Sequence, residues 1–219
     1  MKKRNIVTKL VTCFDEVLEV TNQRVVYWRK ENALILSDLH IGKSAHFQRS
    51  GIPIPSSILA VDLSRLEELI HYFKAEQLIV VGDLFHACYN KDLDTFKVWL
   101  SSFKNLSIKL VKGNHDRLQN RIYEAFQIEV FSDFLQIDSL KFVHDFSVIQ
   151  SDAFTISGHT HPGVLIKGKG KQRMKLPCYQ VTKYQLILPA FSLFTGLNTK
   201  DAPRGCKNFG FTESAIFEL

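Results

Sequence analysis

Leu110-Val111-Lys112-Gly113-Asn114-His115-Asp116-Arg117 joins a short apolar run to three polar side chains of different chemistry. Ile108, Leu110 and Val111 predict the end of a buried strand, and Gly113 breaks it. An amide, an imidazole and a carboxylate follow directly. One interpretation is a polar turn whose aspartate caps the next helix. The other is a strand end that carries a functional site, and the rest of the chain favours it.

The length and composition predict a folded chain outside the membrane. At 219 residues and 45% hydrophobic, it can bury a full core. We expect a single domain over residues 1–219, because no linker, repeat or low-complexity tract interrupts it. No apolar run is long enough to span a membrane, and the basic start lacks the apolar segment of a secretory signal. The widely spaced cysteines favour reduced thiols in a cytoplasmic protein.

Positive charge gathers in the last third of the chain. Residues 1–150 hold 19 Lys and Arg against 18 Asp and Glu, whereas residues 151–219 hold 9 against 4. This surplus favours an anionic partner, for which DNA is the main candidate. Residues Lys167 to Lys175 alternate cations with glycines and predict a basic hairpin that could follow a nucleic-acid backbone. The alternative interpretation is an ordinary solvated hairpin.

The first part of the chain alternates strands and helices. Strands are predicted for residues 7–11, 16–28 with a turn near residue 22, 33–36, 78–81 and 108–111. Helices are predicted for residues 56–74, 92–104 and 118–126. Residues 42–55 contain several glycines and prolines and are predicted as a loop. The β-α-β-α-β order indicates a parallel sheet flanked by helices.

Strands dominate the second part of the chain. A hairpin is predicted for 134–137 and 140–143, followed by strands at 154–157, 163–167, 172–177, 184–188 and 214–217. An α/β part followed by a mostly β part predicts an α/β fold. We expect two mixed β-sheets packed face to face with helices outside, in a four-layer αββα sandwich.

Five predicted strands end in polar clusters. These are Asp38-Leu39-His40, Gly82-Asp83, Gly113-Asn114-His115-Asp116, His144-Asp145 and Gly158-His159-Thr160-His161. Because the carboxyl ends of such strands converge on one crevice, we expect these side chains to lie together. Their carboxylates, amide and imidazoles are too many for one tetrahedral ion. They suit two divalent cations of the Mn, Fe or Zn type, which can clamp both oxygens of a phosphoryl displacement.

The five clusters follow, in order over residues 38–161, the pattern DxH…GD…GNHD…H…GHxH, and so resemble the calcineurin-like metallophosphoesterase superfamily. The resemblance implies that one metal is held by Asp38, His40 and His161. It implies a second metal held by Asn114, His144 and His159, with Asp83 as the bridge. His115 would be the acid near the leaving-group oxygen, oriented by Asp116.

Further stretches resemble the bacterial DNA ligase-associated metallophosphoesterases over roughly residues 25–200. These stretches are Asp38–Lys43, Phe47–Pro55, Gly82–His86, Leu188–Phe191 and Thr195-Gly196. The resemblance implies a DNA endonuclease or phosphodiesterase of DNA repair that acts beside a ligase and a helicase. Manganese is the expected metal, with iron or zinc as alternatives. One departure is Asp145 after His144, where we would expect glutamate.

The expected mechanism is metal-dependent hydrolysis. A divalent cation lowers the pKa of bound water from 15.7 to about 7, and protonated His115 would donate to the departing oxygen. We expect Arg49 and Arg117 to contact phosphate and His86 to lie near the substrate, while His46 has no assigned role. A phosphatase or cyclic-nucleotide phosphodiesterase acting on a small substrate is the alternative enzyme, and a scaffold the non-catalytic one. Strand preference, polarity and a homodimer stay open.

Overall fold

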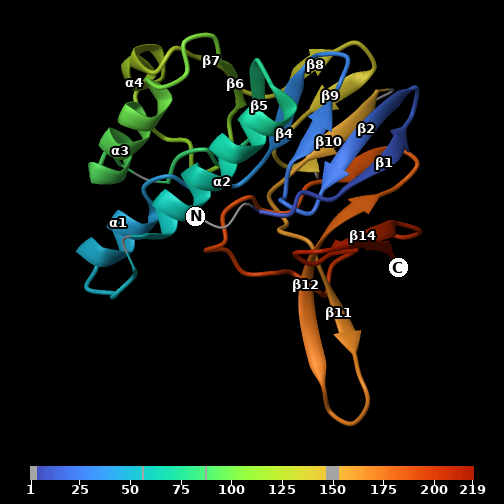
Figure 1. Cartoon of the computed structure of the whole chain (residues 1–219). Helices are drawn as coiled ribbons and strands as arrows, with labels where there is room; N and C mark the ends of the chain where they lie inside the picture. Colours follow the sequence, from blue (N-terminus) through green and yellow to red (C-terminus); the bar gives the residue numbers. More distant parts are fainter. Residues whose placement is uncertain (1–3, 56, 87, 147–152) are drawn as a thin grey trace.

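The computed structural model describes residues 4–55, 57–86, 88–146 and 153–219. In this part of the chain, one sheet of seven strands and one of eight pack face to face, with the helices beside the first (Figure 1). Both sheets contain parallel and antiparallel pairs. The predicted α/β fold of two mixed sheets is therefore confirmed.

The first sheet has the strand order β1-β2-β3-β4-β5-β6-β7. Its strands are β1 (Thr8–Cys13), β2 (Glu16–Thr21), β3 (Val26–Trp28), β4 (Ala33–Leu36), β5 (Gln77–Val81), β6 (Ser107–Val111) and β7 (Ile128–Phe131). The pairs from β1 to β4 are antiparallel, and those from β4 to β7 are parallel. The carboxyl ends of β4, β5 and β6 therefore lie at one edge of this sheet.

The second sheet has the order β15-β14-β12-β13-β10-β9-β8, with β11 paired to β12. Its strands are β8 (Leu135–Ile137), β9 (Leu140–Phe142), β10 (Phe154–Ser157), β11 (Gly163–Lys167), β12 (Arg173–Val181), β13 (Gln185–Ile187), β14 (Lys207–Phe211) and β15 (Ile216–Glu218). Strand β10 runs parallel to both of its neighbours, β9 and β13.

Two apolar layers hold the fold together. In β4, Leu34 and Leu36 join the core under the helices, whereas Ala33 and Ile35 join the core between the sheets. Because both faces of this strand are covered, its sequence is apolar throughout. Helix α2 (Ser57–Phe73) buries Leu63 and Leu66 on the first sheet, as its 3.6-residue spacing predicts.

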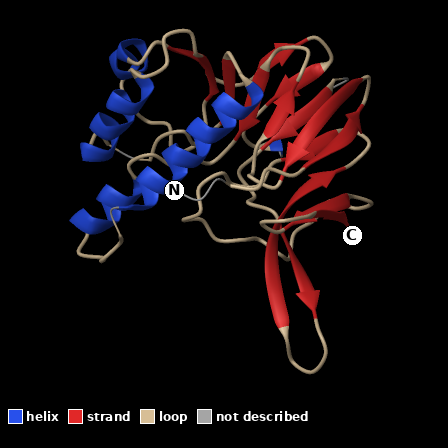
Figure 2. Cartoon of the chain, in the orientation of Figure 1, coloured by secondary structure: helices blue, strands red, loops and turns tan. Residues whose placement is uncertain are grey.

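The helices are α1 (Lys43–Arg49), α2, α3 (Lys91–Leu100) and α4 (Asn120–Ala125). All four fall within the segment that builds the first sheet, and Figure 2 shows them on one side of the strands. Over the described ranges no α-helix follows β7. The helical layer that a four-layer αββα sandwich would place outside the second sheet is therefore not seen in this part of the chain.

Several elements differ from the sequence predictions. Helix α1 occupies residues that the sequence predicted as a loop. It was missed because it is short, follows a glycine with φ 96° and has no side-chain cap. Strands β7 and β14 were not predicted, and β14 contains Gly210 within the strand. Strand β12 continues to Val181 rather than ending at 177, and α3 ends at Leu100 rather than 104.

Two further findings concern the helices and the cysteines. None of the helices in the described ranges has both the length and the apolar character needed to cross a bilayer. All four cysteines lie in described positions and are free thiols. Burial raises the pKa of the Cys13 and Cys178 thiols to about 12, so both stay protonated at neutral pH.

Candidate metal centre

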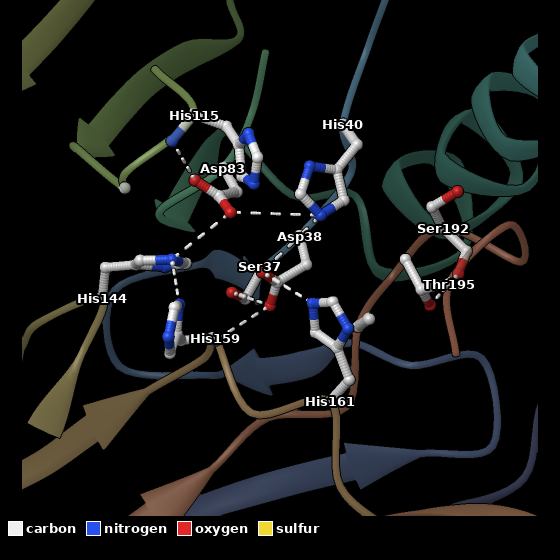
Figure 3. A network of polar contacts seen from close by, with 12 residues as sticks. Ser37, Asp38, His40, Asp83, His115, His144, His159, His161, Ser192 and Thr195 are labelled. Atoms are coloured by element: carbon white, nitrogen blue, oxygen red, sulfur yellow. Dashed lines mark hydrogen bonds and ion pairs between the residues drawn. The ribbon is translucent and has the colours of Figure 1, made fainter. Parts of the chain in front are cut away.

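Loops from both sheets meet at one place. Asp38 and His40 follow β4, Asp83 follows β5, and His115 follows β6. From the second sheet, His144 follows β9, and His159 and His161 follow β10. Figure 3 shows these side chains turned toward one another. These seven side chains, which come from all five of the predicted clusters, are therefore neighbours in space.

The backbone is strained at this meeting point. Left-handed φ angles occur at Asp38 (57°), His40 (53°), Asp83 (54°), His159 (67°) and His161 (50°). Residues other than glycine adopt such angles at a cost, and they persist only where the surrounding structure enforces them. Five of the eleven non-glycine residues with a positive φ in the described ranges thus lie in the loops that carry the candidate ligands.

Glycines let these loops approach closely. A Cβ atom added at Gly158 would lie 1.7 Å from Ser37 Oγ and 2.8 Å from Asp38 Oδ2. At Gly82, where φ is 82°, it would lie 2.0 Å from His144 Nδ1. A side chain at either position would push the loops apart. The glycines before Asp83 and His159 are therefore needed for the site to assemble.

In each of the two buried aspartates, one carboxylate oxygen accepts hydrogen bonds from the protein and the other faces the imidazole rings. Asp38 Oδ2 accepts hydrogen bonds from Ser37 Oγ at 2.5 Å and from the His159 backbone N–H at 3.1 Å. Asp83 Oδ1 accepts from the His115 backbone N–H at 2.9 Å. The other oxygens, Asp38 Oδ1 and Asp83 Oδ2, face the imidazole rings. One oxygen of each carboxylate is therefore held in place and the other is directed into the site.

The directed oxygens and the ring nitrogens form a continuous chain of close approaches. Asp38 Oδ1 lies 3.2 Å from His161 Nε2 and 4.0 Å from His40 Nε2. Asp83 Oδ2 lies 4.0 Å from His40 Nε2 and 3.4 Å from His144 Nε2. His144 Nε2 lies 3.2 Å from His159 Nδ1. These distances give two groups whose candidate ligand atoms lie within 4.8 Å of one another, Asp38–His40–His161 and Asp38–Asp83–His144.

Several of these atoms are buried without a hydrogen bond. They are Asp38 Oδ1 and both ring nitrogens of His40, and the approach of His161 to Asp38 does not form one. Burying a polar atom without a partner costs about 1–3 kcal/mol, so native proteins rarely do it without a function. Carboxylate oxygens and imidazole nitrogens together are the donor set of first-row divalent cations. The residues present thus fit such ions.

The charges at the site suit a cation as well. Burial would raise the pKa of both aspartates, but the neighbouring rings and hydrogen bonds outweigh it, lowering the pKa of Asp38 and bringing that of Asp83 to about 2. Burial lowers the pKa of His40 to about 3, so this ring is neutral and keeps a free lone pair. The site therefore presents two anions and a neutral imidazole.

A backbone carbonyl of β5 orients the His144 ring. Its Nδ1 lies 3.0 Å from the Val81 carbonyl, which can only accept, so Nδ1 carries a proton and Nε2 faces Asp83. Burial opposes a charge on this ring, but the hydrogen bond to Asp83 and the charges of Asp38 and Asp83 raise its pKa to about 9. Without a metal, a proton therefore occupies the Nε2 atom that faces the carboxylate.

His115 lies among other imidazoles. Its ring stacks on His86 with centroids 4.5 Å apart and meets His40 edge-on at 5.3 Å. His46, exposed on α1, lies 5.4 Å from His86. Burial and then the charge of His115 lower the pKa of His86 to about 4. His86, in the loop after β5, and His46, on α1, thus extend the imidazole cluster.

Asp116 is bonded to the backbone. Its oxygens accept from the N–H groups of Asp83 (2.8 Å), Phe85 (2.8 Å) and Gly113 (2.9 Å). Burial raises its pKa to about 6. The sequence resemblance implied that it orients the His115 ring. These three bonds instead tie the loop after β5 to the loop after β6, so Asp116 supports the backbone that carries His115.

The remaining predicted residues lie at the surface. Asn114 is exposed, and its carbonyl accepts from Arg117 Nε at 2.7 Å. Arg117 is exposed in the same loop, and Arg49 is exposed at the end of α1. The described contacts bring none of these three side chains into the two candidate metal groups, and their expected roles stay predictions.

One supporting segment was missed by sequence reasoning. Phe191 N donates to Ser37 O at 2.8 Å, and Ser192 N donates to Asp38 O at 3.2 Å, so this segment holds the loop after β4. Buried Arg65 donates to the Phe191 carbonyl and lies 3.0 Å from Asp62. The sequence signal for this segment was the Leu188–Phe191 stretch, which carries part of the family resemblance.

Lys43 was also not predicted as a site residue. It is half-buried at the start of α1, and its ammonium lies 5.6 Å from the centroid of the Phe194 ring. Burial lowers its pKa, while the charges of Asp38 and Asp83 act in the opposite direction. A cation near two carboxylates adds to the positive potential around the site. The sequence signal for Lys43 was its place in the Asp38–Lys43 stretch, which carries part of the family resemblance.

Comparisons with known proteins give a family match and two solved structures. A family model described as calcineurin-like phosphoesterase matches residues 32–186. The crystal structure of Pseudomonas putida nuclease MPE matches with a TM-score of 0.83 and 24% identity, covering 97% of this chain and 100% of that one. Yfce, a phosphoesterase from E. coli, matches with a TM-score of 0.45 and 16% identity, covering 85% and 97%. A search of curated proteins finds no match.

Proposed function

The chain belongs to the calcineurin-like phosphoesterase family, and we propose that it is a DNA endonuclease that hydrolyses phosphodiester bonds with two divalent metal ions. The observation that carries the proposal is the set of buried polar atoms aimed at one point. Asp38 Oδ1 and His40 Nε2 are buried without hydrogen bonds, and Asp83 Oδ2 faces the same ring. A protein that did not bind a metal there would gain nothing from this arrangement.

The proposed ligands are those that the sequence resemblance implied. Asp38, His40 and His161 hold one ion, and their grouping within 4.8 Å supports this. Asn114, His144 and His159 hold the second, with Asp83 between the two. The 3.4 Å approach of Asp83 to His144 and the 3.2 Å approach of His159 to His144 support this part. Manganese is the expected metal, and iron or zinc takes the same donors.

Each residue then has a task in hydrolysis. When bound, the two cations supply charge that stabilises the phosphate oxygens and a nucleophilic water near neutral pH. His115 holds a proton on its ring for the departing oxygen, and the stacked His86 ring restricts its motion. Asp116 keeps the loops of Asp83 and His115 together. Lys43, with Arg49 and Arg117 at the surface, attracts the phosphate.

DNA is the proposed substrate because of the positive charge of the chain and its similarity to a solved nuclease. The net charge of +6 and the basic surplus after residue 150 favour a polyanion over a small diester. The solved neighbour from Pseudomonas putida carries the word nuclease in its name, which adds to this support. We further propose a role in DNA repair in the cytoplasm, beside a ligase and a helicase.

The test is cleavage of single-stranded and duplex DNA with EDTA or with added Mg, Mn or Zn, beside hydrolysis of bis-p-nitrophenyl phosphate. We expect metal-dependent cleavage that Asp83→Asn abolishes and that His115→Ala slows by about 10²–10⁴-fold. His71→Ala is the matched control, since His71 is exposed on α2. Hydrolysis of the small diester without DNA cleavage would favour a small-substrate phosphodiesterase. Metal binding without either activity would favour a scaffold.

A further inference from the structure

The hairpin of β11 and β12 extends away from the rest of the molecule (Figure 1). Its strands pair antiparallel from Gly163 with Pro177 to Lys167 with Arg173, and the Gly168 N–H donates to the Gln172 carbonyl at 3.0 Å. Residues 167–175 are exposed throughout. The β11–β12 hairpin is therefore a regular arm, and its outer half does not pack against the hydrophobic core.

The arm carries charge of one sign. Its cations are Lys167, Lys169, Lys171, Arg173 and Lys175, and residues 163–177 contain no aspartate or glutamate. Lys167 stands directly opposite Arg173, and Lys175 stands opposite Leu165 two positions further along. Because side chains alternate between the faces of a strand, these three cations share one face. The other face carries Val164, Ile166, Met174 and Leu176.

This arrangement does not help the hairpin to fold. Like charges directly opposite each other on paired strands are destabilising, and a carboxylate at either position would relieve the repulsion. Among the residues that the structure describes, no ion pair involves a cation of this hairpin. The row of cations is therefore better explained by an anion outside the chain than by the stability of the hairpin.

The base of the arm is fixed to the metal centre. Strand β11 begins two residues after the candidate ligand His161. Asn198 N donates to the His161 carbonyl at 2.9 Å, and the Gly163 N–H donates back to the Asn198 carbonyl at 2.8 Å. Lys167 lies six positions after His161, a span of at most about 20 Å at roughly 3.3 Å per residue. One strand of a duplex places a phosphate every ~3.4 Å along the axis, so this span matches roughly six phosphates.

We propose that the face of the β11–β12 hairpin that carries Lys167, Arg173 and Lys175 binds the sugar–phosphate backbone of the DNA whose scissile phosphate lies at the metal centre. This inference rests on the proposed nuclease function and extends it to how the polymer is held. Residues 163–177 contain no aromatic side chain on which a base could stack. The contact is therefore to phosphates alone and independent of base sequence.

The test compares two triple variants with the native enzyme. The first, Lys167→Glu, Arg173→Glu and Lys175→Glu, reverses the cationic face. The matched control, Lys74→Glu, Lys97→Glu and Lys104→Glu, makes the same change at exposed lysines on and beside helices α2 and α3. The measurements are DNA affinity by fluorescence anisotropy over a salt series, cleavage of oligonucleotides of increasing length, and hydrolysis of bis-p-nitrophenyl phosphate.

We expect the hairpin variant to bind DNA about tenfold or more weakly, with a salt slope reduced by roughly 2–3. Its hydrolysis of the small diester stays native, because that reaction needs only the metal centre. The loss should appear with oligonucleotides that extend roughly six nucleotides past the cleavage site and vanish with shorter ones. The control variant should keep most of the affinity. Native-like affinity and cleavage in the hairpin variant would overturn the inference while leaving the nuclease function intact.

A native enzyme that neither binds nor cleaves DNA, yet hydrolyses the small diester, would overturn the proposed function and the inference with it. The single change Lys167→Glu provides an independent readout. It places a carboxylate opposite Arg173, so the melting temperature should hold or rise while DNA affinity falls. A lower melting temperature with unchanged affinity would show that the cation serves the fold, against the inference.

Discussion

Asp38 and Asp83 show how single residues prepare this site. Each uses one oxygen to bind the protein backbone and directs the other toward the imidazoles. Such anchoring fixes the carboxylate before any cation arrives, so little ordering remains to be done on binding. His144 is prepared in the same way by the Val81 carbonyl. The polar contacts of the candidate ligands are thus set by backbone groups of neighbouring strand ends.

Protons should compete with metal for these residues, and the metal-free protein should reveal this as a pH dependence of stability. The pKa of His40 is lowered to about 3 and that of His86 to about 4, so the folded state binds fewer protons than the unfolded chain. Stability should therefore rise with pH from about 4 to about 6.5. The pKa of His144 is raised to about 9, so its contribution is complete below about 6.5 and is lost as pH rises through 9.

The measurement is the melting temperature of the protein in EDTA across pH 4–10. We expect a maximum near pH 6.5 and a decline toward pH 9 that His144→Gln removes. His71→Gln, at an exposed position on α2, should leave the curve unchanged. A decline of the same size in the His144→Gln variant would contradict the assignment.

At the scale of elements, the site is positioned by the ends of the strands and by the glycines that follow β5 and β10. Gly158 ends β10 against Ser37 and Asp38, which follow β4 in the other sheet. The segment containing Phe191 and Ser192 also binds this loop, through two backbone hydrogen bonds. The site residues keep their left-handed backbone angles because the packing of these elements enforces that conformation.

Replacing Gly158 with alanine should therefore disrupt the centre. The added Cβ would lie 1.7 Å from Ser37 Oγ, and we expect a loss of about 1–3 kcal/mol of stability together with weakened metal binding. Gly196→Ala is the matched control, because an added Cβ there meets nothing within 4 Å. Thermal melting and metal titration by calorimetry measure the two effects. Native behaviour of Gly158→Ala would refute the close approach.

Arg65 should act through the segment it holds. It is buried beside Asp62 and donates to the Phe191 carbonyl. Arg65→Met leaves the buried Asp62 carboxylate with the Leu193 N–H but without its ion-pair partner, and we expect a loss of about 3–5 kcal/mol. Adding Asp62→Leu removes that charge and should restore much of the stability. A double variant less stable than the single one, in chemical denaturation, would contradict this account.

The sequence predicted most elements but not all of them. Apolar runs such as Ala33–Leu36 and the helical spacing in residues 57–73 carry strong local signals, and the strand ends after them located the candidate ligands. Helix α1 and strand β14 lack such signals, since one begins without a side-chain cap and the other contains glycine. The contacts of Arg65 and Asp116 depend on tertiary structure, which no local pattern encodes.

At the scale of the whole molecule, the candidate ligands come from both sheets. Asp38, His40 and Asp83 follow strands of the first sheet, whereas His144, His159 and His161 follow strands of the second. A bound cation would therefore join the two sheets at the edge of their shared core. The basic hairpin extends from the second sheet close to this junction. The proposed metal centre and the proposed DNA-binding hairpin thus lie at one edge of the molecule.

Removing metal should lower the stability of the whole fold. A cation at 100 times its dissociation constant stabilises the native state by about 2.7 kcal/mol per site. For a chain of this length that corresponds to a melting temperature roughly 5–10 °C higher than in EDTA. Differential scanning calorimetry with and without manganese measures the shift, and Asp83→Asn should reduce it. The same melting temperature in EDTA and in manganese would argue against a metal that joins the sheets.

The most direct test follows DNA cleavage as manganese is returned to the EDTA-treated protein. The protein is titrated in measured equivalents against a labelled oligonucleotide, with metal content determined in parallel. We predict that cleavage is absent without metal, reaches its maximum as the second equivalent binds, and does not recover in Asp83→Asn. Two bound equivalents without any cleavage of DNA, or cleavage that is complete at one equivalent, would contradict a nuclease with two metal ions.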